Sequence, residues 1–306
     1  MSEMSWRAAL TDAERELTAA GVPSPRVDAE LLAAHVLGIR RAQLALLGGA
    51  GPGGGAGPGG GAGPGGAAGP GGTAEPDRLA EFRALTARRA TREPLQYLLG
   101  TAPMGPVDVA VGPGVFVPRL ETELLLEWGL RALAGVPKPL VVDLCTGSGA
   151  LAAAVAASRP DADVYAVELD PEALTWARRN LGDRAHLVHG DVTDAGLLPA
   201  LHGRVDLVLA NPPYVPEGTP VPPEVADHDP HRAVFAGPDG LAVIRPLVVL
   251  AIRLLRPGGA LAVEHDDTHA SAAPEVLRGH PELTDVVERA DLAGRPRFVT
   301  GARVAP

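Results

Sequence analysis

The sequence predicts an α/β protein with a doubly wound parallel sheet, preceded by a small helical domain. From residue 140 onward, short apolar runs alternate with segments long enough to form helices. A glycine-rich turn follows the first of these runs, whereas apolar residues between positions 6 and 47 recur at helical spacing. Strands that alternate with helices of this length are typical of parallel, doubly wound sheets, and the early helical periodicity indicates a separate helical domain.

Residues 1–93 are expected to form the helical domain. Pro23 and Pro25 divide its first half into at least two helices, because proline interrupts a helix or occupies its first turn. A further helix is expected from Pro76 to Arg92. The intervening residues 48–75 are almost entirely glycine, alanine and proline. They can bury almost no apolar surface, so this stretch is predicted to be a disordered insert.

A linker over residues 94–118 and a larger domain over residues 119–306 are expected to follow. Weak alternation from Val107 to Val117 predicts a β-hairpin in the linker. A helix is expected from Leu124 to Ala134. The apolar runs predict strands at 140–144, 163–168, 185–188, 205–210, 259–264 and 297–300. Helices are expected between them at 149–158, 171–181, 194–201 and 240–255.

Composition and charge argue against some classes of function. The 306 residues include 27 Lys and Arg against 37 Asp and Glu, which gives a formal charge of −10. This balance argues against extensive nucleic-acid binding through a broad basic surface. Cys145 is the only cysteine, so the chain has no internal disulfide and no cysteine-based metal site.

We expect a cytoplasmic protein that does not associate with membranes. No run approaches the roughly 20 apolar residues of a membrane span, and the first ten residues do not resemble a secretory signal. A single cysteine is compatible with a reducing cytoplasm. His265 and His269 lie near two aspartates but without further ligand spacing, so a solvated loop is expected there and no metal site.

The glycine-rich turn after residue 143 predicts a cofactor site. Gly147 and Gly149 allow the backbone to approach a ligand closely, and the following helix start offers free N–H groups. Glu168 ends the next strand, where an acid can accept both hydroxyls of a ribose, and Asp191 could accept from an adenine amino group. A solvated carboxylate is the simpler alternative for each acid. NAD would suit the same place, but Ala152 replaces the last glycine of its usual motif.

The second candidate site is Asn211-Pro212-Pro213-Tyr214, which follows the apolar run 205–210. Ligands of open α/β sheets bind at the carboxyl ends of the strands, so this segment and the glycine-rich turn should share one edge. The Asn side-chain oxygen and a proline carbonyl can accept both hydrogens of a planar NH₂ group, and the aromatic ring can cover its flat face. This pattern indicates chemistry on an amide or exocyclic amine nitrogen, although a proline-rich turn capped by asparagine is possible on sequence grounds.

These motifs resemble class I S-adenosyl-methionine-dependent methyltransferases, and among them the protein-(glutamine-N5) methyltransferases that modify class 1 peptide-chain release factors. The resemblance covers nearly the whole chain. It includes Arg92-Glu93-Pro94 with Tyr97 and Gly100, Val117-Pro118-Arg119 with Glu121-Thr122-Glu123, Asp239-Gly240-Leu241, Pro257-Gly258-Gly259, and Asp291-Leu292-Ala293-Gly294-Arg295. Cys145 stands where the family usually has glycine, and Leu120 where it has proline.

The resemblance implies a doubly wound Rossmann-like methyltransferase sheet, S-adenosyl-methionine as cofactor, and a release factor as protein partner gripped with help from the helical domain. The methylated group would be the Gln amide in a Gly-Gly-Gln loop. The implied catalytic residues are Asn211, Pro212 and Tyr214, and Pro213 joins them in binding substrate. The implied cofactor residues are Asp143, Cys145, Thr146, Gly147, Ser148, Gly149, Glu168, Asp191, Val192 and Asn211.

Three other functions are compatible with the same motifs. One is methylation of a ribosomal-protein glutamine, which is a closely related reaction. Another is methylation of an adenine amine in nucleic acid, which would need a basic, base-flipping surface. The last is a binding module that has kept the fold without turnover.

Overall fold

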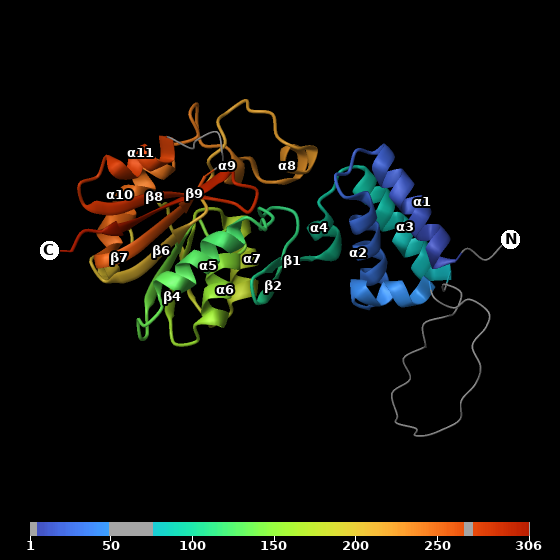
Figure 1. Ribbon diagram of the computed structural model, residues 1–306, viewed down its shortest axis with the longest axis horizontal. Helices are drawn as coiled ribbons and strands as arrows, with labels where there is room; N and C mark the ends of the chain where they lie inside the picture. The colour runs from blue at the N-terminus through green and yellow to red at the C-terminus, as the bar shows by residue number, and fades with distance from the viewer. Residues whose placement is uncertain (1–4, 49–75, 266–271, 306) are drawn as a thin grey trace, which may run out of the picture. The chain divides into compact units, whose positions relative to one another are not determined.

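The computed structural model describes residues 5–48, 76–265 and 272–305. The chain divides into two compact units, Met1–Leu99 and Gly100–Pro306 (Figure 1). Apart from Gly48, the predicted insert at 48–75 lies outside the described residues, as do His269 and its two neighbouring aspartates. Among the described residues, no helix has both the length and the apolar character needed to cross a membrane.

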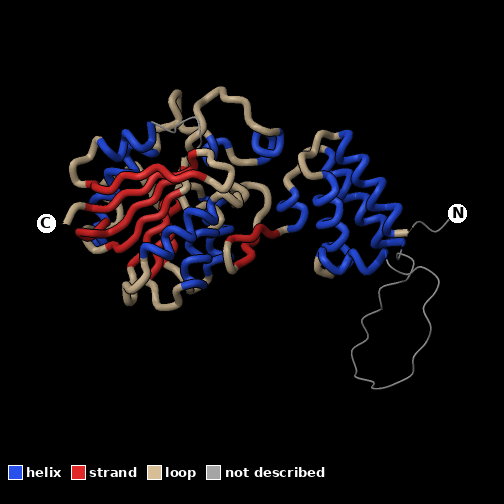
Figure 2. Tube along the Cα trace, in the orientation of Figure 1, coloured by secondary structure: helices blue, strands red, loops and turns tan. Residues whose placement is uncertain are grey.

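The first unit is helical, as predicted (Figures 1 and 2). Its helices pack around one apolar core. Pro25 begins the second helix, and Leu17, Leu32 and Phe82 are almost completely buried between the helices. Its elements are α1 (Trp6–Ala19), α2 (Pro25–Leu37), the 3-10 helix η1 (Arg41–Gly48), α3 (Pro76–Ala90) and α4 (Leu95–Leu99).

The second unit contains a two-stranded hairpin and a seven-stranded sheet, drawn in red in Figure 2. The sheet order is β5-β4-β3-β6-β7-β9-β8, and its first five strands are parallel. The strands are β1 (Thr101–Met104), β2 (Val107–Ala110), β3 (Leu140–Leu144), β4 (Asp163–Glu168), β5 (His186–His189), β6 (Val205–Ala210), β7 (Leu255–Glu264), β8 (Leu283–Ala290) and β9 (Pro296–Arg303).

Helices cover both faces of the sheet (Figure 1). On one face, α5 (Thr122–Ala132), α6 (Ala150–Ser158) and α7 (Pro171–Leu181) pack side by side, and α10 (Ile244–Leu254) and α11 (Ala272–Arg278) lie on the other. The short helices α8 (Pro223–His228) and α9 (His231–Val234) follow β6. The doubly wound α/β fold is therefore confirmed.

The strand order reverses between β3 and β6. After β3, the chain adds β4 and β5 on one side of β3, and then adds β6 and β7 on its other side. In doubly wound sheets the crevice for ligands lies at the carboxyl ends of the strands at such a reversal. Leu144 pairs with Ala210, so the segments that follow these two residues begin side by side. The fold thus brings the glycine-rich turn and the Asn211–Tyr214 segment to one place.

Several expectations for this unit were wrong in detail. His265, expected in a solvated loop, is completely buried, and its backbone N–H donates to the Arg297 carbonyl oxygen at 2.9 Å. The sheet is mixed, because β9 runs antiparallel to both β7 and β8, and β8 was not predicted. The predicted helix at 194–201 is only the 3-10 turn η2 (Pro199–Leu201), preceded by Leu198 in a left-handed conformation. The hairpin begins at Thr101 and ends at Ala110, earlier than the predicted range of 107–117.

Candidate active site

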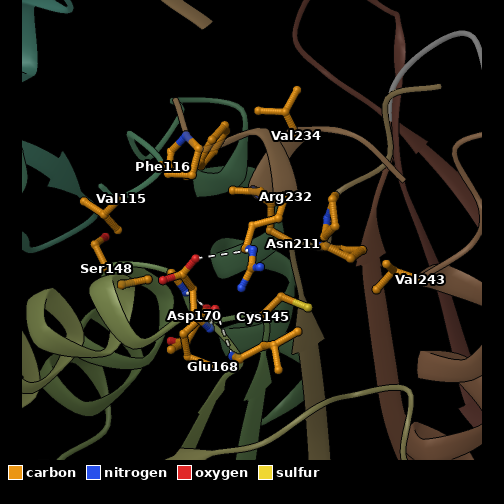
Figure 3. Close-up of a pocket in the computed structure, with 18 of the residues that line it drawn as sticks. Val115, Phe116, Cys145, Ser148, Glu168, Asp170, Asn211, Arg232, Val234 and Val243 are labelled. Carbon is orange, nitrogen blue, oxygen red and sulfur yellow. Dashed lines mark hydrogen bonds and ion pairs between the residues drawn. The ribbon is translucent and has the colours of Figure 1, made fainter. Parts of the chain in front are cut away.

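A cavity of about 360 Å³ lies at the carboxyl edge of the sheet (Figure 3). Four segments predicted to form the site line it: the turn Cys145–Ser148, Glu168 after β4, the pair Asp191–Val192 after β5, and Asn211–Tyr214 after β6. Asp143 and Gly149 are not among the lining residues. The structure therefore brings the two sequence motifs together around one space.

Asp143 lies behind the glycine-rich turn and shapes it. Its Oδ2 accepts a hydrogen bond from the Thr146 hydroxyl at 2.5 Å and another from the Ala152 N–H at 3.1 Å. The side chain is buried, and this burial raises the pKa of Asp143 to about 7. Gly149 also has a packing role, because a Cβ there would lie 3.3 Å from the Cα of Ala177 in α7.

Glu168 ties the turn to the end of β4. Its Oε2 accepts from the Gly147 N–H at 2.8 Å, and its Oε1 accepts from the N–H groups of Leu169 and Asp170 at 2.9 and 2.8 Å. Burial raises the pKa of Glu168, while these backbone hydrogen bonds oppose the shift. Because each carboxylate oxygen can accept more than one hydrogen bond, Glu168 has acceptor capacity left for a ligand.

Cys145 adopts a backbone conformation that favours glycine. Its φ is +63°, in the left-handed region that is costly for residues with a Cβ. This explains why a glycine is usual at this position in the family that the sequence resembles. Burial raises the pKa of the Cys145 thiol, which disfavours the thiolate that a nucleophile would require.

The Asn211–Tyr214 segment is anchored by two side-chain hydrogen bonds. The Asn211 Nδ2 donates to the Thr122 hydroxyl oxygen at 3.2 Å, and the Tyr214 hydroxyl donates to the Glu264 Oε1 at 3.3 Å. Since the amide group is planar, directing Nδ2 toward Thr122 places Oδ1 on the other side of Asn211. An acceptor oxygen, a proline carbonyl and a phenol ring are thus grouped beside the cavity.

The sequence did not reveal the contacts that connect the segments around the cavity. Asp229 Oδ2 accepts from Arg119 at 2.5 Å, and its Oδ1 accepts from the Val117 N–H at 3.4 Å, which joins two lining segments. Across the cavity, Asp170 and Arg232 form an ion pair of 3.5 Å (Figure 3). Arg119 lies in the Val117–Glu123 motif, for which the sequence indicated no role. No motif in the sequence included Asp229 or Arg232.

We expect Arg119→Met to destabilise the protein by about 1–3 kcal/mol, because it removes a partner of a buried carboxylate. The Asp229 side chain has no exposed surface, and burial raises its pKa to about 6 against the opposing effect of Arg119. Urea unfolding of the full chain measures the change. Arg131→Met is the matched control, because Arg131 and its partner Glu127 are about 60% exposed and should contribute less than about 0.5 kcal/mol. Equal urea midpoints for Arg119→Met and Arg131→Met would contradict a stabilising role for the Arg119–Asp229 ion pair.

Comparisons with known proteins agree with these features. The family described as "Methyltransferase small domain" matches residues 111–226, and the family "PrmC N-terminal domain" matches residues 8–50. A release factor glutamine methyltransferase of Mycolicibacterium smegmatis is 50% identical over 98% of each chain. The proteins of the same name from Corynebacterium glutamicum and Streptomyces coelicolor are 48% and 43% identical, and each alignment spans 97–98% of both chains. This chain therefore belongs to the release factor glutamine methyltransferase family.

Proposed function

We propose that the protein transfers a methyl group from S-adenosyl-methionine to the side-chain amide nitrogen of the Gln in the Gly-Gly-Gln loop of class 1 peptide-chain release factors. One observation carries this proposal: the Asn211–Tyr214 segment and the glycine-rich turn line the same cavity. The Asn side chain there is held with its oxygen free to accept from an NH₂ group. The names of the relatives, which specify a release-factor glutamine, support the same substrate.

The residues around the cavity fit the proposed cofactor. Glu168 has the acceptor capacity to hold the ribose hydroxyls, and Asp191, which also lines the cavity, would accept from the adenine amino group. A Cβ on Gly147 would meet nothing within 4 Å, so the turn leaves open space where a ligand can approach its backbone. When bound, S-adenosyl-methionine supplies a methyl group on a sulfonium, which is already a good leaving group. The protein therefore has to bring the nucleophile into position.

An amide nitrogen is a poor nucleophile, because its lone pair is delocalised into the carbonyl. The Asn211 Oδ1 and the Pro212 carbonyl would accept the two amide hydrogens and thereby orient the nitrogen toward the methyl carbon. These acceptors also stabilise the positive charge that develops on the NH₂ group as its lone pair is used. Tyr214 packs beside the amide plane. The extra proton leaves after methyl transfer, so no general base is needed before it.

We also propose that three segments of the chain have different functions. Residues 1–93 would help to bind the release factor, 94–118 would act as a linker, and 119–306 would carry the methyltransferase chemistry. In the structure, the boundary between the two compact units lies between Leu99 and Gly100. The cytoplasm is the location we propose for the reaction.

Partition of labelled methyl groups among candidate substrates tests this function. The full chain is incubated with methyl-labelled S-adenosyl-methionine and, separately, a release factor, its Gln→Glu variant at the Gly-Gly-Gln loop, ribosomal proteins, and RNA or DNA. We expect label in the wild-type release factor and almost none in the variant. Label confined to nucleic acid or to ribosomal proteins would refute the proposal and favour one of the alternative methyltransferases, and no label anywhere would favour a non-catalytic module.

A further inference from the structure

Two buried polar residues, Thr122 and Glu264, lie behind the Asn211–Tyr214 segment, next to the cavity. Thr122 is the first residue of α5 and Glu264 the last of β7, and both side chains are almost completely buried. The Thr122 hydroxyl is one of the groups that lower the pKa of the neighbouring Glu264 carboxyl group by hydrogen bonding, and its oxygen accepts from the Asn211 Nδ2 at 3.2 Å. The Tyr214 hydroxyl donates to the same carboxyl group at 3.3 Å. Both polar side chains of the Asn211–Tyr214 segment are thus connected to Glu264.

The ionisation state of Glu264 determines which groups donate and which accept between Glu264, Thr122 and Asn211. An ionised carboxylate can only accept hydrogen bonds, and a threonine hydroxyl has a single hydrogen to donate. When Thr122 gives this hydrogen to Glu264, its oxygen can only accept from Asn211. Asn211 must then present its NH₂ group to Thr122 and its carbonyl oxygen to the other side. The charge on Glu264 therefore selects one of the two orientations of the Asn211 amide.

We propose that Thr122 and Glu264 are positioning residues, which hold the Asn211 side chain so that its oxygen, and not its NH₂ group, faces the substrate amide. This inference rests on the proposed function, in which Asn211 accepts a hydrogen from the target nitrogen. A flipped Asn211 would place its own NH₂ against the substrate NH₂, so that two donors would meet without an acceptor. The Thr122 of the Glu121-Thr122-Glu123 motif thereby gains a role that the sequence did not reveal.

The protonation state of Glu264 should control this arrangement. Burial raises the pKa of Glu264 to about 7, and Glu121 at the start of α5 adds to the shift. Hydrogen bonds from Thr122 and Tyr214, together with Arg297 in β9, oppose it. Below pH 7 the protonated carboxyl can donate to Thr122, which frees the hydroxyl hydrogen to point at Asn211. The methyl-transfer rate should therefore fall as pH decreases through about 7.

The test compares Thr122→Val, which keeps the size and branching of the side chain, with Thr122→Ser, which keeps the hydroxyl. We expect Thr122→Val to lower kcat for release-factor methylation about tenfold, the effect of losing one hydrogen bond. S-adenosyl-methionine affinity, measured by calorimetry, should change less than about twofold. Thr122→Ser should retain most of the wild-type rate. A wild-type kcat for Thr122→Val, or an equal loss in Thr122→Ser, would overturn the inference.

Two further measurements separate positioning from general packing. In an Asn211→Ala background, Thr122→Val should have almost no further effect on the methyl-transfer rate, because the residue it positions is already gone. The same tenfold loss in both backgrounds would contradict a role through Asn211. Glu264→Gln should abolish the decline in rate below pH 7, and a wild-type pH profile in that variant would equally overturn the inference. If wild-type protein methylates no glutamine at all, the proposed function itself fails, which is a different outcome.

Discussion

Asn211→Ala should lower kcat for glutamine methylation by about 10²–10³, the usual effect of removing a polar group that acts in the transition state. The substrate amide would lose one of its two acceptors and could rotate away from the methyl carbon. Affinity for S-adenosyl-methionine should change much less, because the proposed contact is to the substrate. Single-turnover rates and calorimetric titration measure the two effects separately.

Asn211→Asp is the sharper control for this position. An aspartate keeps an acceptor facing the substrate but cannot donate to the Thr122 hydroxyl as Nδ2 of Asn211 does. We expect it to retain more activity than Asn211→Ala and less than wild type. A single-turnover rate for Asn211→Ala equal to that of wild type would contradict the mechanism, as would a defect confined to cofactor binding.

Glu168→Ala should weaken S-adenosyl-methionine binding about a hundredfold or more. Two charge-assisted hydrogen bonds to the ribose, each contributing at least about 1.5 kcal/mol, correspond to a change of that size. The substitution also leaves the Gly147 N–H without the acceptor that holds the glycine-rich turn in place. Calorimetry of the full chain with S-adenosyl-methionine measures the loss directly.

Glu275→Ala provides the matched control, because Glu275 is an exposed carboxylate on α11, away from the cavity. Its dissociation constant for S-adenosyl-methionine should stay within about twofold of the wild-type value. Glu168→Gln retains the size of the side chain and should bind with intermediate affinity. Unchanged affinity in Glu168→Ala would mean that the ribose does not bind at this carboxylate.

Much of the fold could be predicted because buried parallel strands are continuous apolar runs. The strands β3, β4 and β6 have the bounds that the sequence predicted. The strand β8 was missed because it lies at the sheet edge, where charged residues such as Asp285 and Glu288 replace the apolar run. The predicted helix at 194–201 failed because the Asp194 side chain caps the Gly196 N–H in a turn and Pro199 lacks a donor.

The candidate site could be predicted only where its residues follow strands in recognisable motifs. Glu168 and Asn211 were found in this way, and both line the cavity. Thr122 was not given a role, because it is 89 residues from Asn211 in the sequence and only the packing of α5 against the sheet brings them together. Asp229 and Arg119 are similarly 110 residues apart. Contacts between distant segments have no local pattern that a single sequence could reveal.

Mass mapping of the methylated product tests the central claim most directly. A release factor is incubated with the full chain and S-adenosyl-methionine, digested, and its peptides are fragmented to locate the added methyl group. We predict a single methyl on the side-chain nitrogen of the Gln in the Gly-Gly-Gln loop, absent when Asn211→Ala replaces the wild-type enzyme for the same short incubation. A methyl group on any other residue, or an unmodified Gln beside methylated nucleic acid, would contradict the account.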